Sequence, residues 1–239
     1  MEITSTEAQN NFEKYLKFSQ LEDVVITKNG RKIAVIKACS EDEYGDAVLA
    51  EKAEAYTGNP KMTYEEFLQF SEGSENRYEF IGGEVYLMAS PSYAHQSAIE
   101  EILSFMHQWF KGRKCRPLPA PFDITLTESD RKNVVEPDIV VICDTESIDE
   151  KGRYFGTPSL LVEVLSDSTR NKDLLKKSDL YAKSGVREYW IVNPRKKEVF
   201  VYEFEDCGIK DMMAFKGNET LRSGIFQDLE IPLKEIFTA

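Results

Sequence analysis

The sequence contains few of the residues from which zinc sites and disulfide frameworks are built. Its 239 residues include four cysteines, none of them in a Cys-x-x-Cys pair, and two histidines. Such scattered residues do not form a zinc site by spacing, so any bound metal should be a hard cation held by oxygen ligands. We expect reduced thiols, as is usual in a cytoplasm, with Cys143 as a small core residue at the end of an apolar run.

Long apolar segments are also missing. The longest uninterrupted apolar runs, of which Ile139 to Cys143 is one, are far too short to cross a bilayer. The residues from Met1 to Thr6 have no basic start and no apolar stretch, so they do not resemble a signal peptide. The sequence therefore predicts a cytoplasmic protein with no membrane partner.

Basic residues are outnumbered by acidic ones. Thirty Lys and Arg stand against 42 Asp and Glu, which gives a formal net charge of −12. This balance excludes nucleic-acid binding through a broad basic surface, so any such contact must be local or metal-mediated. The acidic excess either serves solubility or includes carboxylates that converge on a cation. With 14 Phe and 11 Tyr, the chain has enough apolar material for a folded core.

Residues 1–40 have a self-contained pattern. A short β-prone start is followed by a predicted helix from Glu7 to about Gln20, which Thr6 could cap. Asn29-Gly30 between two β-branched runs predicts a hairpin. The result is a small β-α-β-β module that cannot bury a core alone, so it should pair with a second copy or pack on the rest of the chain.

Residues 41–61 are acidic and then polar, which is typical of a linker, and residues 62–239 form a second domain. Thr63 opens a Thr-x-x-Glu capping box, and Gly82-Gly83 marks a hairpin. Alternating helices and hairpins predict an α/β fold, a mixed β-sheet flanked by helices. The expected strands are 78–81, 84–87, 122–126, 138–143, 160–165, 189–192, 198–204 and 211–215, and the longer expected helices are 93–111 and 171–184.

Two carboxylates interrupt apolar strands. Asp138 opens the run that ends at Cys143, and Glu163 lies inside the predicted strand 160–165. A carboxylate in a buried strand is costly unless it is paired or bound to metal. Two such strands side by side would bring both carboxylates to one place, an arrangement that holds a divalent cation for phosphodiester hydrolysis. An edge position or a salt bridge is the alternative for either residue.

Asp173, Lys177 and Tyr181 share one face of the helix that follows Glu163, because they stand four residues apart. Asp173 and Lys177 could form a surface ion pair. In the other interpretation, Lys177 points at the carboxylate pair, where its ammonium group could orient a water or offset charge on a phosphate. Tyr181 would then pack or hydrogen-bond beneath it. The pattern alone leaves both interpretations open.

Several short stretches stand in a specific order and spacing: 78–84, Ser90-Pro91 with His95, 136–140, 161–166 with Ser168-Thr169, Asp173 to Lys177 to Tyr181, and 185–194. Together they resemble the Uma-type endonuclease family, a branch of the PD-(D/E)XK nuclease superfamily, over residues 62 to 237. The resemblance implies a restriction-endonuclease-like fold. It also implies a divalent-metal-dependent nuclease that hydrolyses phosphodiester bonds of nucleic acid, with DNA as the expected substrate.

The same resemblance assigns the metal-binding residues. Asp138 and Glu163 would hold Mg²⁺ or Mn²⁺, together with the backbone carbonyl of Val164. The superfamily's lysine normally stands two places after the glutamate, where this chain has Leu165. In the Uma-type branch the lysine lies on the following helix, and Lys177 is the matching residue.

The remaining site residues also follow from the resemblance. Glu79 resembles an additional acidic residue of such nucleases, the alternative being a solvated hairpin carboxylate. His95 matches the branch, although a lone histidine can equally be structural. The catalytic set is then Asp138, Glu163, Lys177 and Glu79, with His95, Asp173 and Tyr181 as accessory residues and Lys172 and Lys176 as phosphate-binding residues.

Four stretches near the N-terminus (3–8, 10–12, 25–30 and 34–36) resemble the N-terminal domain of the Phd/YefM antitoxins. The resemblance implies a homodimer and leaves open whether this module binds operator DNA or a toxin partner. Residues 1–40 contain six basic and five acidic residues, so self-association is better supported than DNA binding. The alternative function is therefore a non-catalytic, antitoxin-like dimer that regulates by binding DNA or protein.

Overall fold

The structure, a computed structural model, describes residues 1–19, 23–28, 30–37, 61–88, 90–165 and 176–238. The chain divides into two compact units, Met1–Ala50 and Glu51–Ala239. The expected linker falls almost wholly outside the described residues. Within the described part of the chain, no helix is long and apolar enough to cross a membrane.

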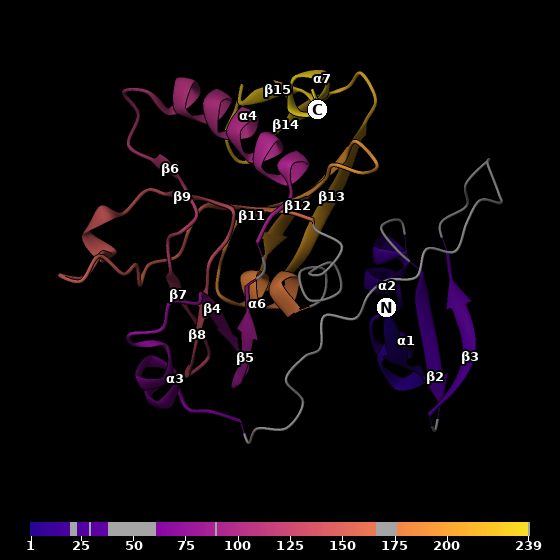
Figure 1. Cartoon of the computed structure of the whole chain (residues 1–239). Helices are drawn as coiled ribbons and strands as arrows, with labels where there is room; N and C mark the ends of the chain where they lie inside the picture. Colours follow the sequence, from indigo (N-terminus) through magenta and orange to yellow (C-terminus); the bar gives the residue numbers. More distant parts are fainter. Residues whose placement is uncertain (20–22, 29, 38–60, 89, 166–175, 239) are drawn as a thin grey trace. The chain divides into compact units, whose positions relative to one another are not determined.

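The first unit is a three-stranded sheet with two short helices (Figure 1). β1 (Glu2–Thr4) pairs in parallel with β2 (Val24–Lys28), and β2 pairs antiparallel with β3 (Arg31–Ile36). The β2–β3 pair confirms the predicted hairpin. Helices α1 (Ser5–Asn10) and α2 (Phe12–Phe18) connect β1 to β2. The buried apolar side chains of this unit are Ile3, Ala8, Tyr15, Phe18 and Val24.

The prediction of a single helix capped by Thr6 is wrong in two respects. The helix begins at Ser5, because Thr4 forms the capping box: its side chain accepts a hydrogen bond from the Glu7 amide, and its own amide donates one to the Glu7 carboxylate. The helix also breaks at Asn11, whose φ of −137° and ψ of 38° are not helical. The module is therefore β-α-α-β-β, and its likeness to the antitoxins stays a prediction.

A six-stranded mixed sheet lies at the centre of the second unit, in the order β13-β12-β11-β10-β9-β6. β10 and β11 are parallel, and the other neighbours are antiparallel. The strands are β6 (Arg116–Pro119), β9 (Ile139–Ile142), β10 (Leu160–Val164), β11 (Glu188–Asn193), β12 (Glu198–Glu205) and β13 (Gly208–Lys216). The expected mixed α/β fold is present.

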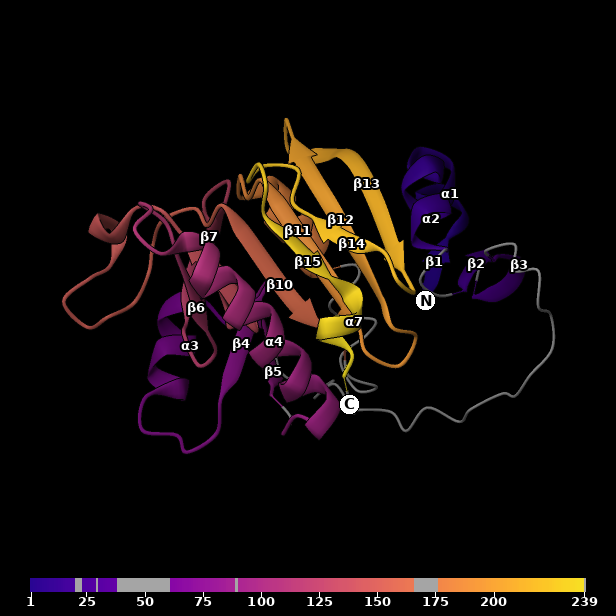
Figure 2. The ribbon, with the colours of Figure 1, turned by 90° about the horizontal axis from the view of Figure 1, so that it is seen from above.

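Alternate residues of the central strands face two different layers. Val162 and Trp190 belong to a large core with α4 (Tyr93–Phe110), β14 (Thr220–Arg222), β15 (Glu230–Pro232) and α7 (Leu233–Ile236), which cover one face (Figures 1 and 2). On the other face, Tyr181 of α6 (Ser178–Lys183) packs edge-on against Tyr189, with 5.0 Å between ring centroids. Because β-strand side chains alternate, Glu163 lies on the α6 face.

A separate four-stranded sheet completes the second unit, in the order β5-β4-β8-β7. Its strands are β4 (Tyr78–Ile81), β5 (Glu84–Leu87), β7 (Ile124–Glu128) and β8 (Arg131–Val135), and helix α3 (Tyr64–Ser71) packs on it. Phe67 of α3 stacks on Phe80 at 4.9 Å between ring centroids. This sheet places Glu79 of β4 beside the strand ends of the central sheet.

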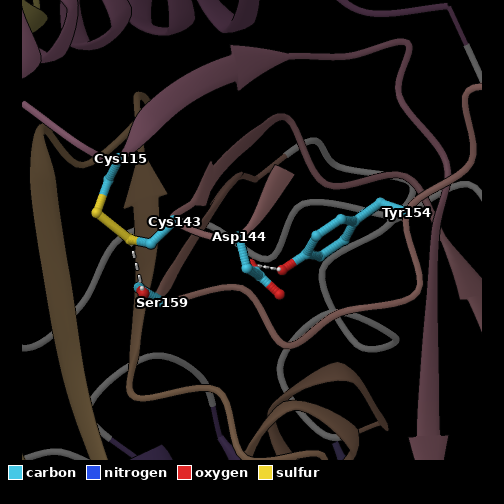
Figure 3. The surroundings of a disulfide bond; sticks show 5 residues. All are labelled: Cys115, Cys143, Asp144, Tyr154 and Ser159. Carbon is cyan, nitrogen blue, oxygen red and sulfur yellow. Dashed lines mark hydrogen bonds between the residues drawn. A yellow bond between two sulfur atoms is a disulfide. The ribbon is translucent and has the colours of Figure 1, made fainter. Parts of the chain in front are cut away.

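Cys115 and Cys143 form a disulfide, so the expectation of four reduced thiols, with Cys143 as a core residue, is wrong (Figure 3). The β6–β9 register pairs Arg116 with Ile142. Continued by one residue, it sets the two cysteines opposite each other, and their Cα atoms are 4.0 Å apart. Cys143 is half-buried, and its sulfur lies 3.2 Å from the Ser159 hydroxyl. The pairing could not be predicted from spacing because β6 was not predicted.

Candidate active site

Asp138 and Glu163 come together at the ends of two adjacent strands. β9 and β10 pair antiparallel with Val162 opposite Ile139, so the register continued by one residue sets Glu163 opposite Asp138. Directly opposite residues in such a pair point to the same face. The Val164 amide donates to Asp138 Oδ2 at 2.7 Å, which holds that carboxylate against β10. The predicted side-by-side placement of the two carboxylates is present.

Both carboxylates line one cavity of about 420 Å³. Its walls come from the β4–β5 hairpin, the start of α4, the segment after β6, and the ends of β9 and β10. The titratable residues that line it are Arg77, Glu79, His95, Glu136, Asp138, Glu163 and Lys177. Four of these seven are carboxylic acids, so the cavity is suited to cations.

Lys177 lies between two carboxylates rather than on the surface. Its ammonium nitrogen is 2.6 Å from Glu163 Oε1 and 2.8 Å from Glu79 Oε1, and its side chain is 2% exposed. Tyr181, one helical turn on, donates to Glu163 Oε1 at 2.8 Å. Burial, together with the Glu163 charge, raises the pKa of Tyr181 well above its usual value, which keeps the phenol a donor. Because the Lys177 side chain is buried, the interpretation of Lys177 as one half of a surface ion pair is excluded.

Glu79 is buried, so it is not a solvated hairpin carboxylate. Besides its contact with Lys177, its Oε1 accepts a hydrogen bond from the Glu136 amide at 3.1 Å. Glu163, on the interior strand β10, is not at a sheet edge, and its salt bridge with Lys177 belongs to the same cluster. The two sheets of the unit are thus joined through Glu79 and Lys177.

His95 enters the cavity from the first turn of α4. The Ser92 hydroxyl caps this helix by accepting the His95 amide hydrogen, and the ring Nε2 lies 3.3 Å from Asp138 Oδ2. Its buried Nδ1 has no hydrogen-bond partner in the described part of the chain. His95 therefore lies in the same cavity as Asp138 and Glu163.

The structure does not place the other three predicted residues, Lys172, Asp173 and Lys176, in the cavity. Lys172 and Asp173 lie outside the described residues. Lys176 binds the Glu84 carboxylate and the Tyr86 hydroxyl of β5 and is not among the residues that line the cavity. The hydrogen bond from Lys176 lowers the pKa of Glu84. A phosphate-binding role for Lys176 would require it to leave this pair.

Sequence reasoning missed Arg77 and Glu136. Arg77 donates through Nη1 to Glu136 Oε1, and both residues line the cavity. Burial raises the pKa of Glu136 to about 7, while the Arg77 charge opposes this rise. Glu136 stands two places before Asp138, a spacing that puts both side chains on one side of an extended segment, and this pattern could have identified it.

The donor set fits a hard divalent cation. Asp138 and Glu163 offer carboxylate oxygens at one place, and Asp138 Oδ1 has no hydrogen-bond partner among the described residues. The structure shows no group of three or more His, Cys, Asp or Glu arranged as metal ligands in the part of the chain that it describes. Mg²⁺ is commonly held by one or two carboxylates, with waters and substrate phosphate completing the shell.

Comparisons with known proteins show which family this chain resembles. A protein of Synechocystis sp., slr1290, is described as uncharacterized; it is 29% identical over 164 residues, which cover 68% of this chain and 84% of that protein. The fold is similar to the crystal structure of "a putative nuclease belonging to DUF820" from Anabaena variabilis, with a TM-score of 0.62, 24% identity, and coverage of 74% of this chain and 98% of that one. The model of the Uma2 family, described as "Putative restriction endonuclease", matches residues 64–234. The chain therefore belongs to the Uma2 family.

Proposed function

We propose that this protein is a divalent-metal-dependent nuclease that hydrolyses phosphodiester bonds of DNA. One observation carries the proposal: Asp138, immediately before β9, and Glu163 of the neighbouring strand β10 line one cavity, with the Lys177 ammonium 2.6 Å from Glu163. Family membership supports the class of activity, because the Uma2 family is described as "Putative restriction endonuclease". The metal and the substrate are the parts of the proposal that need experiment.

Bound Mg²⁺ or Mn²⁺, held by Asp138, Glu163 and the Val164 carbonyl, would supply a water of lowered pKa and neutralise charge on the phosphate. The chain's own groups prepare this site. The Val164 amide fixes Asp138, while Tyr181 and Lys177 fix Glu163. Such preorganised groups need little rearrangement when charge develops in the transition state.

In the proposed mechanism Lys177 replaces the catalytic lysine that PD-(D/E)XK nucleases normally carry two places after the glutamate. That position is Leu165, whose side chain is buried and apolar. Lys177 reaches the same Glu163 from the next helical segment and also contacts Glu79. In the proposed reaction its ammonium group orients the attacking water and offsets negative charge on the phosphate.

The test is a cleavage assay on plasmid and single-stranded DNA with Mg²⁺, Mn²⁺ or EDTA. The wild type should cleave with metal and not with EDTA, and Asp138→Ala and Glu163→Ala should each lose activity by about 100-fold or more. Glu230→Ala is a matched control, since this exposed glutamate pairs with Arg222 away from the cavity. Binding without cleavage that persists in the two site variants would instead support the regulatory binding protein.

We also propose that the first unit makes the protein a homodimer. Four large apolar side chains of this unit are about half exposed: Phe12, Leu16, Ile33 and Val35. Ile33 and Val35 lie on β3, one of the two edge strands of the three-stranded sheet, and exposed apolar edges are sites of self-association. Whether this unit also binds DNA or a toxin partner stays a separate proposal.

A further inference from the structure

Arg77 is held at the cavity wall with part of its guanidinium group unused. Its backbone carbonyl accepts the Met88 amide at 3.0 Å, which extends the β4–β5 hairpin by one pair, and both residues line the cavity. The side chain is 44% exposed, and Nη1 donates to Glu136. The other guanidinium N–H groups make no hydrogen bond with any described residue.

The other basic side chains at the cavity are much less accessible. Lys177 is 2% exposed and already contacts Glu79 and Glu163, and the His95 side chain is 10% exposed. Of the described residues that line the cavity, Arg77 is therefore the cation best placed to meet a substrate. This matters because the chain has a net charge of −12, while DNA presents a phosphate at every nucleotide.

The position of Arg77 is fixed relative to the carboxylate pair. Glu136 is 4% exposed, and its amide donates to Glu79, the same residue that contacts Lys177. Glu136 also stands two residues before Asp138. A guanidinium group anchored on one edge by a carboxylate presents its remaining N–H groups as a planar fork, the geometry that suits a phosphate.

We propose that Arg77 binds a backbone phosphate of the DNA substrate beside the scissile phosphate, and that Glu136 is the residue that positions its guanidinium group. The inference rests on the proposed function in one respect, since it takes DNA as the substrate. It adds a substrate contact that the carboxylates and Lys177 do not provide.

The first experiment measures DNA binding without cleavage. Fluorescence anisotropy with a short fluorescein-labelled DNA duplex, in Ca²⁺ and in EDTA, gives the Kd at several salt concentrations. Arg77→Ala should raise Kd about tenfold and reduce the slope of log Kd against log salt by about 0.9, the contribution of one phosphate contact. Arg77→Lys should keep the slope and raise Kd less, because it keeps the charge but loses the fork.

Two further variants separate this role from a structural one. Arg77→Ala leaves Glu136 buried without its partner, so the double variant Arg77→Ala/Glu136→Gln removes that charge and should show the same binding loss. Arg153→Ala is the matched control, because Arg153 also pairs with a carboxylate, Asp149, but does not line the cavity. It should leave Kd nearly unchanged.

The decisive readout uses duplexes in which single phosphates are replaced by uncharged methylphosphonates. At one position the replacement should weaken wild-type binding and leave the Arg77→Ala variant unaffected, since the contact is already lost. Two results would overturn the inference: a loss of binding that is the same at every substituted position, or an Arg77→Ala variant with the wild-type Kd and salt slope. Either result would do so even if Asp138→Ala abolishes cleavage. Conversely, an Arg77-dependent contact in a protein that never cleaves DNA would retain the binding of a backbone phosphate by Arg77 and reject the nuclease.

Discussion

At the scale of single residues, Lys177 should affect both the proposed reaction and the stability of the fold. Its ammonium group pairs with both Glu79 and Glu163, whose side chains are 0% and 5% exposed. Removing one member of a buried ion pair leaves an uncompensated charge, which is more costly than never having had the pair. Lys177 therefore cannot be replaced without a structural effect.

Lys177→Ala should abolish cleavage and also lower the free energy of unfolding by about 3 kcal/mol. The double variant Lys177→Ala/Glu79→Gln should recover part of that stability, because it removes one of the two stranded charges, yet it should remain inactive. Urea unfolding and the cleavage assay give the two readouts. Retained cleavage in either variant would show that Lys177 is not catalytic.

The sequence could predict some of these residues and not others, for physical reasons. Asp138 and Glu163 stood out because charges inside apolar strands need a partner. Lys177 stood out because it is spaced four residues from Asp173 and from Tyr181. That spacing could not distinguish a surface ion pair from a buried one. Arg77 lies in an ordinary polar context, and it meets Glu136 because β4, which follows Arg77, pairs with β8, which precedes Glu136. Local sequence does not encode this pairing.

At the scale of secondary structure, the strands predicted from apolar runs are present, among them β10, β11 and β12. β6 was missed because its sequence, Arg-Pro-Leu-Pro, contains two prolines, which are unfavourable inside sheets but tolerated on an edge strand. β8 was missed because Arg131, Lys132 and Asn133 are polar. Both strands depend on tertiary pairing that local propensity does not encode.

The disulfide joins β6 to β9, the strand that Asp138 precedes. Cys115→Ser/Cys143→Ser, or reduction of the wild type, should lower the free energy of unfolding by about 2–4 kcal/mol, because the crosslink limits the unfolded chain. Thermal or urea unfolding with and without reductant measures this. Thiol titration of the denatured, unreduced protein provides the control, and reaction of all four cysteines would contradict the disulfide.

At the scale of the whole molecule, the acidic surface and the exposed apolar side chains of the first unit predict different behaviour in solution. The net charge of −12 opposes nonspecific association and DNA binding over a broad surface. The apolar residues on α2 and β3 favour one specific contact between copies. All the described residues that line the candidate active-site cavity belong to the second unit, so dimerisation and cleavage should be separable.

Ile33→Lys/Val35→Lys should shift the full-length protein from dimer to monomer, because two charges at the edge strand oppose strand pairing. Multi-angle light scattering gives the mass, and circular dichroism checks that the fold persists. Replacing Leu87 by Lys is a matched control, since this exposed apolar residue lies on β5 of the second unit. A monomeric wild type, or a variant that stays dimeric, would reject the dimerisation role.

The central claim is that Asp138 and Glu163 hold one divalent cation, and anomalous diffraction from crystals soaked in Mn²⁺ tests it most directly. The account predicts an anomalous peak between these two carboxylates in the wild type and no such peak in Asp138→Ala crystals treated in the same way. No peak at this position in the wild type at saturating Mn²⁺, in crystals of a protein that cleaves DNA, would contradict it.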